Sequence, residues 1–471
     1  MPAWQHICFL KLFELIVFYN LIDVIVKRKE LSPTNAQKAV LKKINYNVAG
    51  IDLGSEEMFI AIIEKEVRKF STFTKGIEEA SEYLKSEGIK KIVMEATGVY
   101  WIPIYEYLEK KGFLLSLVNG AHAKNVPGRK TDVLDSEWLR ELHTYGLLRA
   151  SFIPNEKIRE LRYYVRLRDD HISMGATHIN IIQKNLDMMN IKLHKVIDSV
   201  MSKSGILIIQ AILDGERNAN NLWDLCKNYI NNKKKIDVID SLNGNYRNEY
   251  LFGISQALQM WEYYQAMQKQ CDTKIEELLL QMTADKENPQ NLNTAKPIKK
   301  NKPEIEDFHL LMIKLTLGKD TTAIAGINDY STLKIIAETG TDLCNFKDEK
   351  HFTSWLGLAP SAHQSAKKKR KKGRRHCNRA GMIFRQLAVN VGNGKHSALS
   401  SFYKRIRSRA GKMIAIKATA RKIAVYFFNL MTKGLAFVEE GIKKYEKRYS
   451  QQQEKYLQLK ASEMGYILVK A

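Results

Sequence analysis

Short apolar runs alternate with helical patterns in the first third of the chain. Residues 48–53, 58–63, 92–94 and 114–118 are apolar segments of strand length. The segments between them place apolar residues at helical spacing instead. This alternation predicts an α/β domain over residues 45–150.

Beyond Pro154 the pattern changes to long helices. Apolar residues first repeat every seven positions, with two more on the partner seam: Val165, Ile172, Ile179, Leu186, and then Leu161 and Ile182. Arg168 and Gly175 interrupt that seam. A second stretch has the same spacing, at Leu251, Ile254, Leu258, Trp261, Cys271, Ile275, Leu278 and Met282. Two antiparallel helices that pack on each other explain both stripes, and dimerisation through the stripes is the alternative.

The remaining boundaries follow from composition. Residues 286–304 are rich in proline, lysine and asparagine and predict a linker between a helical, coiled-coil region (151–285) and a second helical domain (305–435). Residues 436–471 form a charged tail. Residues 1–44 contain an apolar stretch that charged residues interrupt, which indicates an amphipathic appendage rather than a membrane span. A start of translation at Met58 would instead remove Asp52.

One glycine-containing turn lies between apolar helical stretches in the sequence AGINDYSTLKIIAETG, residues 325–340. The pattern is similar to a helix-hairpin-helix element, whose backbone amides hold a phosphate. We therefore expect such an element in the C-terminal domain.

Four carboxylates have the spacing of a metal site. Asp52 and Glu95 follow apolar runs at strand ends, and Asp132 and Asp135 share one face of a predicted helix. Four converging acids repel one another unless cations bind them, and their oxygen ligands suit divalent ions. Two such ions support phosphoryl transfer. Any one of these acids read alone is a helix cap or a solvated loop charge, and Asp132 could cap its own helix.

The order of these elements has a known counterpart. A strand that ends in Asp, a hairpin-like continuation, a strand that ends in Glu and a later helix with an acid pair resemble ribonuclease H-like nuclease folds. We therefore expect a multidomain protein, with a ribonuclease H-like α/β domain followed by all-α parts.

The charge indicates a polyanionic partner. Lys and Arg total 75 against 51 Asp and Glu, a net charge of +24, which favours nucleic acid. The densest cluster is Lys367, Lys368, Lys369, Arg370, Lys371, Lys372, Arg374, Arg375 and Arg379, and Lys130 precedes the acid pair. A second basic run spans residues 404–422. Such runs are often solvated segments or localisation signals, but these lie between apolar segments, which favours phosphate contact.

Cysteine usage excludes two kinds of site. The five cysteines are scattered and form no CxxC pair, so we expect neither a disulfide scaffold nor structural zinc. A cytoplasmic location fits, with no stable membrane association. A membrane-surface protein would leave the four acids unexplained.

Two serines immediately precede the basic cluster, Ser361 and Ser365. A loop serine is usually a turn or cap residue. Fixed positive charge around Ser365 would stabilise its alkoxide and a phosphorane-like transition state, so we expect Ser365 to be a nucleophile, with Ser361 as the alternative.

Several motifs together resemble the insertion-sequence one-ten family of DEDD transposases: GIDLGS, MEATGVYW, GRKTDVLDSEWL, GINDYSTLKIIAETG, LGLAPSAHQSA and NRAG, in that order. The resemblance covers residues 45–431. It implies a RuvC-like domain, a coiled-coil middle and a transposase domain with a nucleophilic serine. The implied roles are magnesium ligands for Asp52, Glu95, Asp132 and Asp135, and nucleophile for Ser365.

The same resemblance implies the partners: donor and target DNA, a structured bridge RNA that pairs with both, and other copies of the chain in a dimer or tetramer. We therefore expect a transposase or site-specific DNA recombinase that uses two Mg²⁺ ions. One alternative is a junction-resolving endonuclease that uses the four acids with water as nucleophile. The other is a nucleic-acid-binding transposase relic without catalysis.

Overall fold

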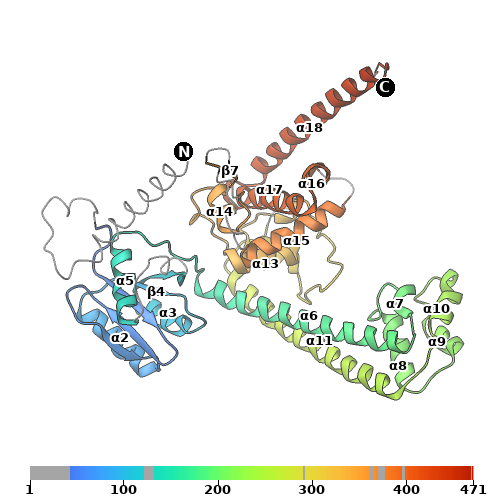
Figure 1. Ribbon diagram of the computed structural model, residues 1–471, viewed down its shortest axis with the longest axis horizontal. Helices are drawn as coiled ribbons and strands as arrows, with labels where there is room; N and C mark the ends of the chain where they lie inside the picture. The colour runs from blue at the N-terminus through green and yellow to red at the C-terminus, as the bar shows by residue number, and fades with distance from the viewer. Residues whose placement is uncertain are drawn as a thin grey trace, which may run out of the picture. The chain divides into compact units, whose positions relative to one another are not determined.

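The computed structural model describes residues 43–120, 132–289, 292–360, 364–365, 368–369, 377–394, 398–467 and 469. The chain divides into two compact units, residues 1–153 and 154–471 (Figure 1). The predicted appendage at residues 1–44 lies almost wholly outside the described residues. None of the described helices is both long and apolar enough to cross a membrane.

The N-terminal unit is built on one mixed five-stranded sheet, in the order β3-β2-β1-β4-β5. β1 pairs antiparallel with β2 and parallel with β4, and β4 pairs parallel with β5. The strands are β1 (Val48–Leu53), β2 (Glu57–Ala61), β3 (Arg68–Ser71), β4 (Lys91–Glu95) and β5 (Leu114–Val118). The predicted ribonuclease H-like α/β domain is thus confirmed.

Helices cover both faces of this sheet. α2 (Thr74–Ser86) and α3 (Trp101–Lys110) bury Leu84 and Ile104 with Ile51 and Met94 on one face. On the other face, Leu139 of α5 (Asp132–Thr144) packs with Val48, Val93 and Val118. The central strands are therefore apolar on both faces, which explains why their sequences are continuous apolar runs rather than alternating ones.

The C-terminal unit begins with a long helical hairpin. α6 (Glu156–Met188) and α11 (Asn248–Thr283) lie side by side along their lengths (Figure 1). Contacts that join Arg168 to Asp272 and Gly253 to Asn185 show that the two helices are antiparallel. The seven-residue stripes therefore pack within one chain.

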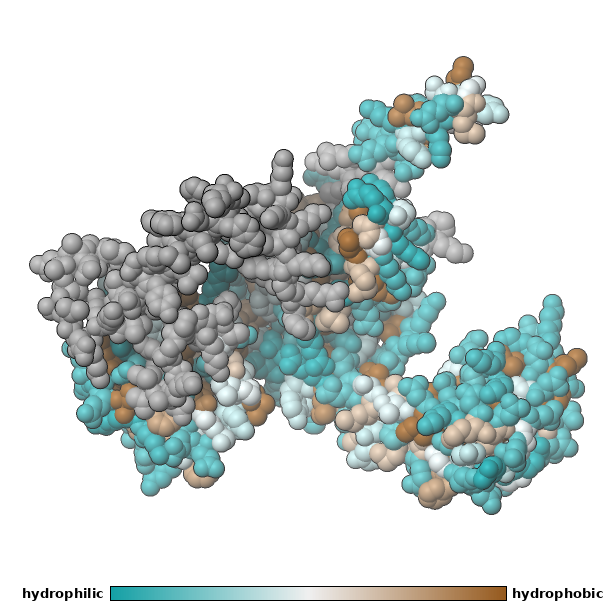
Figure 2. Space-filling view, viewed as in Figure 1, coloured by the Kyte–Doolittle hydropathy of each residue, from teal (hydrophilic) through white to brown (hydrophobic). Residues whose placement is uncertain are grey.

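A small helical bundle closes the far end of this hairpin. Trp223, Leu222 and Ile208 are buried in its core, while its outer surface is mostly hydrophilic (Figure 2). Its helices are α7 (Leu193–Val196), α8 (Lys203–Leu213), α9 (Ala219–Cys226), η2 (Asn232–Lys234) and α10 (Lys235–Ser241).

Arg168 and Gly175 were expected to interrupt the packing of the hairpin, but both are buried within it. The Arg168 side chain is 2% exposed and donates from Nε and Nη2 to the two carboxylate oxygens of Asp272, at 2.5 and 3.2 Å. Its Nη1 donates to the Tyr330 hydroxyl at 2.8 Å. Gly175 is buried against Trp261 and Tyr264. A charge and a gap that seem to break an apolar stripe are accommodated because α11 presents a carboxylate at one site and aromatic rings at the other.

The base of the hairpin shares a core with the last helices. Leu161, Ile275, Phe352, Phe384 and Phe427 are buried in one cluster. The helices that contribute to this part are α12 (Phe308–Leu315), η3 (Thr321–Ala323), α13 (Asp329–Thr339), α14 (Glu349–Trp355), α15 (Arg379–Asn393), α16 (Ala398–Ala410), α17 (Lys412–Lys433) and α18 (Leu435–Glu463). The mainly helical remainder is therefore as predicted.

Candidate active site

Two of the four predicted acids lie at the same end of neighbouring parallel strands. The register of β1 and β4 pairs Ile51 with Met94, so Asp52 and Glu95 follow one residue later on each strand. Side chains alternate along a strand, so both acids share a face with Gly50 and Val93. Asp52 is half-buried and Glu95 is buried.

α5 covers that face because β1 has a glycine there. A Cβ added to Gly50 would lie 2.1 Å from the Ser136 carbonyl oxygen. At the other end of the helix, the Thr144 carbonyl accepts from the backbone N–H groups of Ile44 and Asn45, which precede β1. α5 thus runs antiparallel to β1. Its first turn, which carries Asp135, lies toward the end of β1 that carries Asp52.

The Glu95 carboxylate packs against the chain that follows β5. A Cβ added to Gly120 would lie 1.9 Å from Glu95 Oε1, so only glycine leaves room for this carboxylate. The Ala96 N–H donates to the Val118 carbonyl just beyond the strand ends. Buried and enclosed in this way, Glu95 is fixed in position before any ligand binds.

The carboxylates at this edge of the sheet suit a hard divalent cation, and the structure describes three of the four predicted side chains. Asp52, Glu95 and Asp135 offer carboxylate oxygens, the ligands that Mg²⁺ prefers. The Asp132 side chain lies outside the described residues, although its backbone begins α5. Among the residues described, no group of three or more His, Cys, Asp or Glu side chains is close enough to hold a metal ion.

The predicted nucleophile lies in a short strand pair. β6 (Gln364–Ser365) pairs antiparallel with β7 (Lys368–Lys369), and the register places Ser365 opposite Lys368. The side chains of these residues are outside the described part of the chain. Several other predicted residues lie wholly outside the described residues: Lys130, Ser361, Lys367, Arg370, Lys371, Lys372, Arg374 and Arg375.

The two ends of the serine-bearing segment are held together. The Cys377 thiol donates to the Leu356 carbonyl at 3.0 Å, and Asn378 Nδ2 donates to the Trp355 carbonyl at 3.1 Å. The Asn378 side chain also caps α15 by accepting from the Gly381 N–H at 2.8 Å. The motifs LGLAP and NRAG therefore meet in space, and the segment starts and ends at one place on the body.

The last residue of the NRAG motif, Gly381, is a glycine for a steric reason. An added Cβ there would lie 2.1 Å from the Leu356 carbonyl oxygen and 2.5 Å from the Cys377 sulfur. The first turn of α15 therefore approaches the end of α14 more closely than any side chain allows.

Arg379 is the one member of the predicted basic cluster whose side chain is described. Its guanidinium lies 3.8 Å from Asp170 and 4.0 Å from Glu338, and it lines a cavity of about 620 Å³ together with Arg385 and Lys412. Sequence analysis did not single out Arg385. It lies on α15 beyond the predicted basic cluster, and the packing of α15 against α17 places it beside Lys412 and Lys417.

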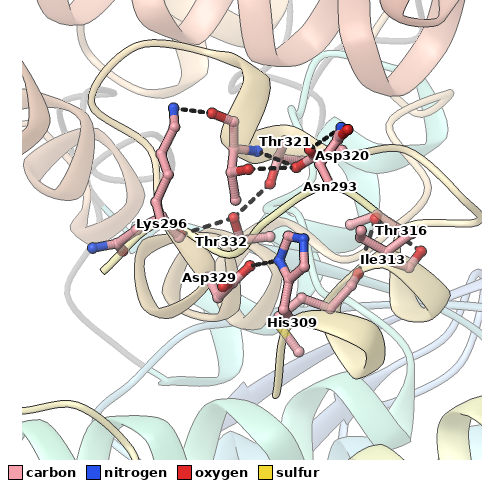
Figure 3. Close-up of polar contacts among 12 residues, drawn as sticks. Asn293, Lys296, His309, Ile313, Thr316, Asp320, Thr321, Asp329 and Thr332 are labelled. Carbon is pink, nitrogen blue, oxygen red and sulfur yellow. Dashed lines mark hydrogen bonds and ion pairs between the residues drawn. The ribbon is translucent and has the colours of Figure 1, made fainter. Parts of the chain in front are cut away.

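The turn expected to hold a phosphate is occupied by the chain itself (Figure 3). Asn328 caps α13 by accepting from the Ser331 N–H at 2.9 Å. Asp329 is buried and lies 2.8 Å from His309 Nδ1. With its first turn buried and capped, α13 has no exposed amides for an external phosphate.

The predicted linker is anchored beside that turn. Asn293 Nδ2 donates to Asp320 Oδ2 at 3.0 Å, and Lys296 Nζ donates to the Thr322 carbonyl (Figure 3). Burial lowers the pKa of Lys296, against the opposing effect of Asp320 and Asp329. The segment between α11 and α12 therefore contacts the body through buried polar groups.

Two family models match the chain. One, described as a transposase and built on DEDD transposases, matches residues 49–191. The other, described as the transposase IS116/IS110/IS902 family, matches residues 321–404. The first spans the sheet, α5 and α6, and the second spans α13 through β6, β7 and α15. A search among curated proteins found no match.

Proposed function

Because this chain belongs to the IS110 family of transposases, we propose that it cuts and rejoins the DNA of an insertion sequence with a serine nucleophile and a Mg²⁺-binding DEDD site. Membership of this family implies DNA phosphoryl transfer and DNA binding. The finer assignments of residues, metal, RNA and assembly are our proposal.

The observation that most supports the proposal is the placement of the acids. Asp52 and Glu95 share one face at one end of parallel strands, and the covering helix carries Asp132 and Asp135. A sheet, and a helix that packs directly on the backbone of its β1 strand, hold such groups in the fixed geometry that phosphoryl transfer requires. A domain over residues 45–150 thus supplies the acids, and one over residues 305–435 supplies the serine.

The proposed chemical step is a transesterification. The Ser365 hydroxyl oxygen attacks the phosphorus of a DNA phosphodiester, the new Oγ–P bond forms, and the bond from phosphorus to the 3′ oxygen breaks. The serine proton ends on the released 3′ oxygen, so the step needs no cofactor to balance. Attack by a 3′ hydroxyl on the phosphoserine reverses it and joins new ends. Lysines and arginines around Ser365 neutralise the charge that develops on the phosphate.

The four acids would contribute to the reaction by holding metal ions at fixed positions. When bound, Mg²⁺ ions on Asp52, Glu95, Asp132 and Asp135, two by our proposal, would neutralise charge on the scissile strand and orient it. Because Glu95 is buried and packed against Gly120, it reaches that arrangement without reordering.

The proposed partners follow from the resemblance. A bridge RNA would pair with donor and target DNA, so that base pairing rather than protein side chains reads sequence. The basic cluster of Lys367–Lys369 and Arg370–Arg379 would then contact phosphates of either strand. We propose a homo-oligomer, a dimer or tetramer, as the active form.

The test is a strand-cleavage assay on junction DNA of the element, with the protein purified together with its co-purifying RNA. Mg²⁺-dependent cleavage should leave a covalent protein–DNA adduct on a denaturing gel. Ser365→Ala should abolish the adduct, whereas Ser361→Ala should retain it. Asp52→Asn should abolish cleavage and spare binding, while Glu56→Gln, an exposed acid just after β1, should leave both unchanged.

Other outcomes identify the rival functions. Cleavage without an adduct would indicate a nuclease that uses water, and an adduct that persists in Ser365→Ala would exclude this nucleophile. Salt-sensitive binding without any Mg²⁺-dependent breakage would indicate a relic. Sequencing of the co-purifying RNA tests guidance separately, since a heterogeneous RNA pool would contradict a defined bridge RNA.

A further inference from the structure

A second cavity lies at the two ends of the serine-bearing segment. Its volume is about 420 Å³, and Pro360 and Cys377, which flank that segment, are both part of its wall. α15 contributes Arg385, and α17 contributes Met413, Ile414, Lys417 and Arg421. All of these residues belong to the C-terminal unit.

The described lining of this cavity carries positive charge only. Arg385, Lys417 and Arg421 line it, and none of the described lining residues is acidic. The Nε atom of Arg421 is buried and has no hydrogen-bond partner among the residues that the structure describes. A buried donor without a partner is costly, so a ligand that accepts a hydrogen bond would be favoured there.

The cavity of about 620 Å³ that Arg379 lines contains acids as well as cations. It contains Glu338 and Asp169, which already hold cations: Arg166 donates to both Glu338 oxygens at 2.8 and 2.7 Å, and Lys334 lies 2.8 Å from Asp169. Among its described lining residues the second cavity has no acid to pair with its cations, so its positive field is available to an external anion.

Two of the cations line the cavity together with Cys377. Burial raises the pKa of the Cys377 thiol, and the nearby charges of Arg385 and Lys417 oppose that rise. Because Cys377 also donates to the Leu356 carbonyl at 3.0 Å, this wall is fixed at the end of α14. The cationic side of the cavity therefore lies against the chain that leads into residues 361–376.

The other side of the cavity is apolar and open. Met413 and Ile414 are 58% and 57% exposed in the first turn of α17, and Leu358 and Pro360 also line the cavity. Large apolar side chains that remain exposed beside cations mark a site for a ligand with a flat or apolar part and an anionic part.

We propose that this cavity binds one unpaired nucleotide of a nucleic-acid strand, with its phosphate on Arg385, Lys417 and Arg421 and its base against Met413 and Ile414. The volume accommodates a single nucleotide and no duplex. The proposal rests on the proposed function, because it holds the strand beside the segment that carries Ser365. An extruded nucleotide there would bend the strand away from its neighbours and expose the adjacent phosphodiester.

The test measures binding, which does not depend on cleavage. The probes are fluorescein-labelled oligothymidylate and oligouridylate of about ten nucleotides, and a duplex of equal length. The readout is fluorescence anisotropy with the full chain. Arg421→Gln should weaken binding of the single strand by about tenfold, as expected for the loss of one charge-assisted contact. Ile414→Gln should weaken it by about fivefold.

Matched controls separate the cavity from general charge and apolarity. Arg247→Gln removes an exposed arginine just before α11, and Leu457→Gln removes an exposed leucine of α18; neither residue lines the cavity. Both should change single-strand affinity by less than about twofold, as should Arg421→Gln with the duplex. Unequal effects on oligothymidylate and oligouridylate would show whether DNA or RNA occupies the site.

The outcomes are distinct from those of the proposed function. Equal losses in Arg421→Gln and Arg247→Gln, or equal losses with single strand and duplex, would overturn the cavity proposal while adduct formation still reports the serine chemistry. If the unaltered protein forms no adduct while the affinity differences remain, the serine chemistry is overturned and the cavity proposal is retained. Arg421→Lys, which keeps the charge, should restore most of the affinity and verifies that the variants fold.

Discussion

Among single residues, Arg168 does most to tie the helical hairpin together. Its guanidinium binds Asp272 on α11 and Tyr330 on α13, so one side chain of α6 joins three helices. The Asp272 carboxylate also accepts from the Glu304 N–H at 3.0 Å, which holds the chain just before α12. The Tyr330 ring lies 4.9 Å from the guanidinium carbon. A buried charge is tolerated here because Nε, Nη1 and Nη2 each donate to an acceptor and an aromatic ring lies beside the guanidinium.

Arg168→Met should destabilise the protein by about 3–5 kcal/mol, because it leaves the buried Asp272 carboxylate without its cation. Chemical denaturation followed by helical circular dichroism measures this loss. The double variant Arg168→Met/Asp272→Leu should recover most of it, since no charge is then left buried. Lys274→Met breaks an exposed ion pair with Glu277 on the same helix and should cause no measurable change. A double variant no more stable than the single one would contradict this account.

At the scale of elements, glycines decide where helices and strands meet. Gly50 brings α5 to backbone distance from β1, and Gly381 does the same for α15 and the end of α14. One contact positions the acids, and the other closes the serine-bearing segment. By contrast, Gly175 in the middle of α6 has its nearest neighbours at 3.7 Å, on Trp261 and Tyr264, and an added methyl group fits there.

The same substitution should therefore have opposite effects at two glycines. Gly50→Ala places a Cβ 2.1 Å from the Ser136 carbonyl, so α5 must move, at a cost of about 1–3 kcal/mol. Cleavage should fall with it, because Asp135 moves with α5. Gly175→Ala should raise stability by up to about 1 kcal/mol, because alanine loses less backbone entropy in a helix. Thermal unfolding of both variants shows whether each substitution lowers or raises the stability of the protein. A stable, fully active Gly50→Ala variant would contradict the packing argument.

At the scale of the whole molecule, charge dominates. The net charge of +24 on 471 residues gives a long-range field that attracts polyanions, and counterions released from phosphates make that attraction depend on salt. Much of the positive charge is concentrated between residues 367 and 422, within the C-terminal unit.

Duplex affinity should therefore fall on the order of a thousandfold between about 50 and 200 mM salt, as expected for six or more phosphate contacts. Neutralising Lys367, Lys368 and Lys369 together to glutamine should reduce the slope of log affinity against log salt by about three. The same change at Lys447, Lys455 and Lys460 of α18, which are exposed, should reduce it less. Equal slopes in the two triple variants would assign the effect to net charge alone.

Local patterns were sufficient to predict much of the fold. The apolar runs at residues 48–53, 92–94 and 114–118 lie in strands, and the acid pair lies in the first turn of a helix. The change from strand to helical spacing at Pro154 coincides with the division between the two units. Such features were predictable because the period of apolar residues and the identity of neighbouring residues set local structure. The charge and the motifs likewise indicated nucleic acid and a transposase.

Other features depend on residues that are distant in sequence. Arg168 seemed to break an apolar seam until Asp272, 104 residues away, was seen to pair with it. The turn at Asn328 seemed open to phosphate until His309 was found beside Asp329 and the first turn of α13 proved buried. Arg385 lines a cationic cavity only because α15 packs on α17, which carries Lys417 and Arg421. Periodicity reports which face of an element is buried, but it does not report which partner buries it, because that choice is made by packing across the whole chain.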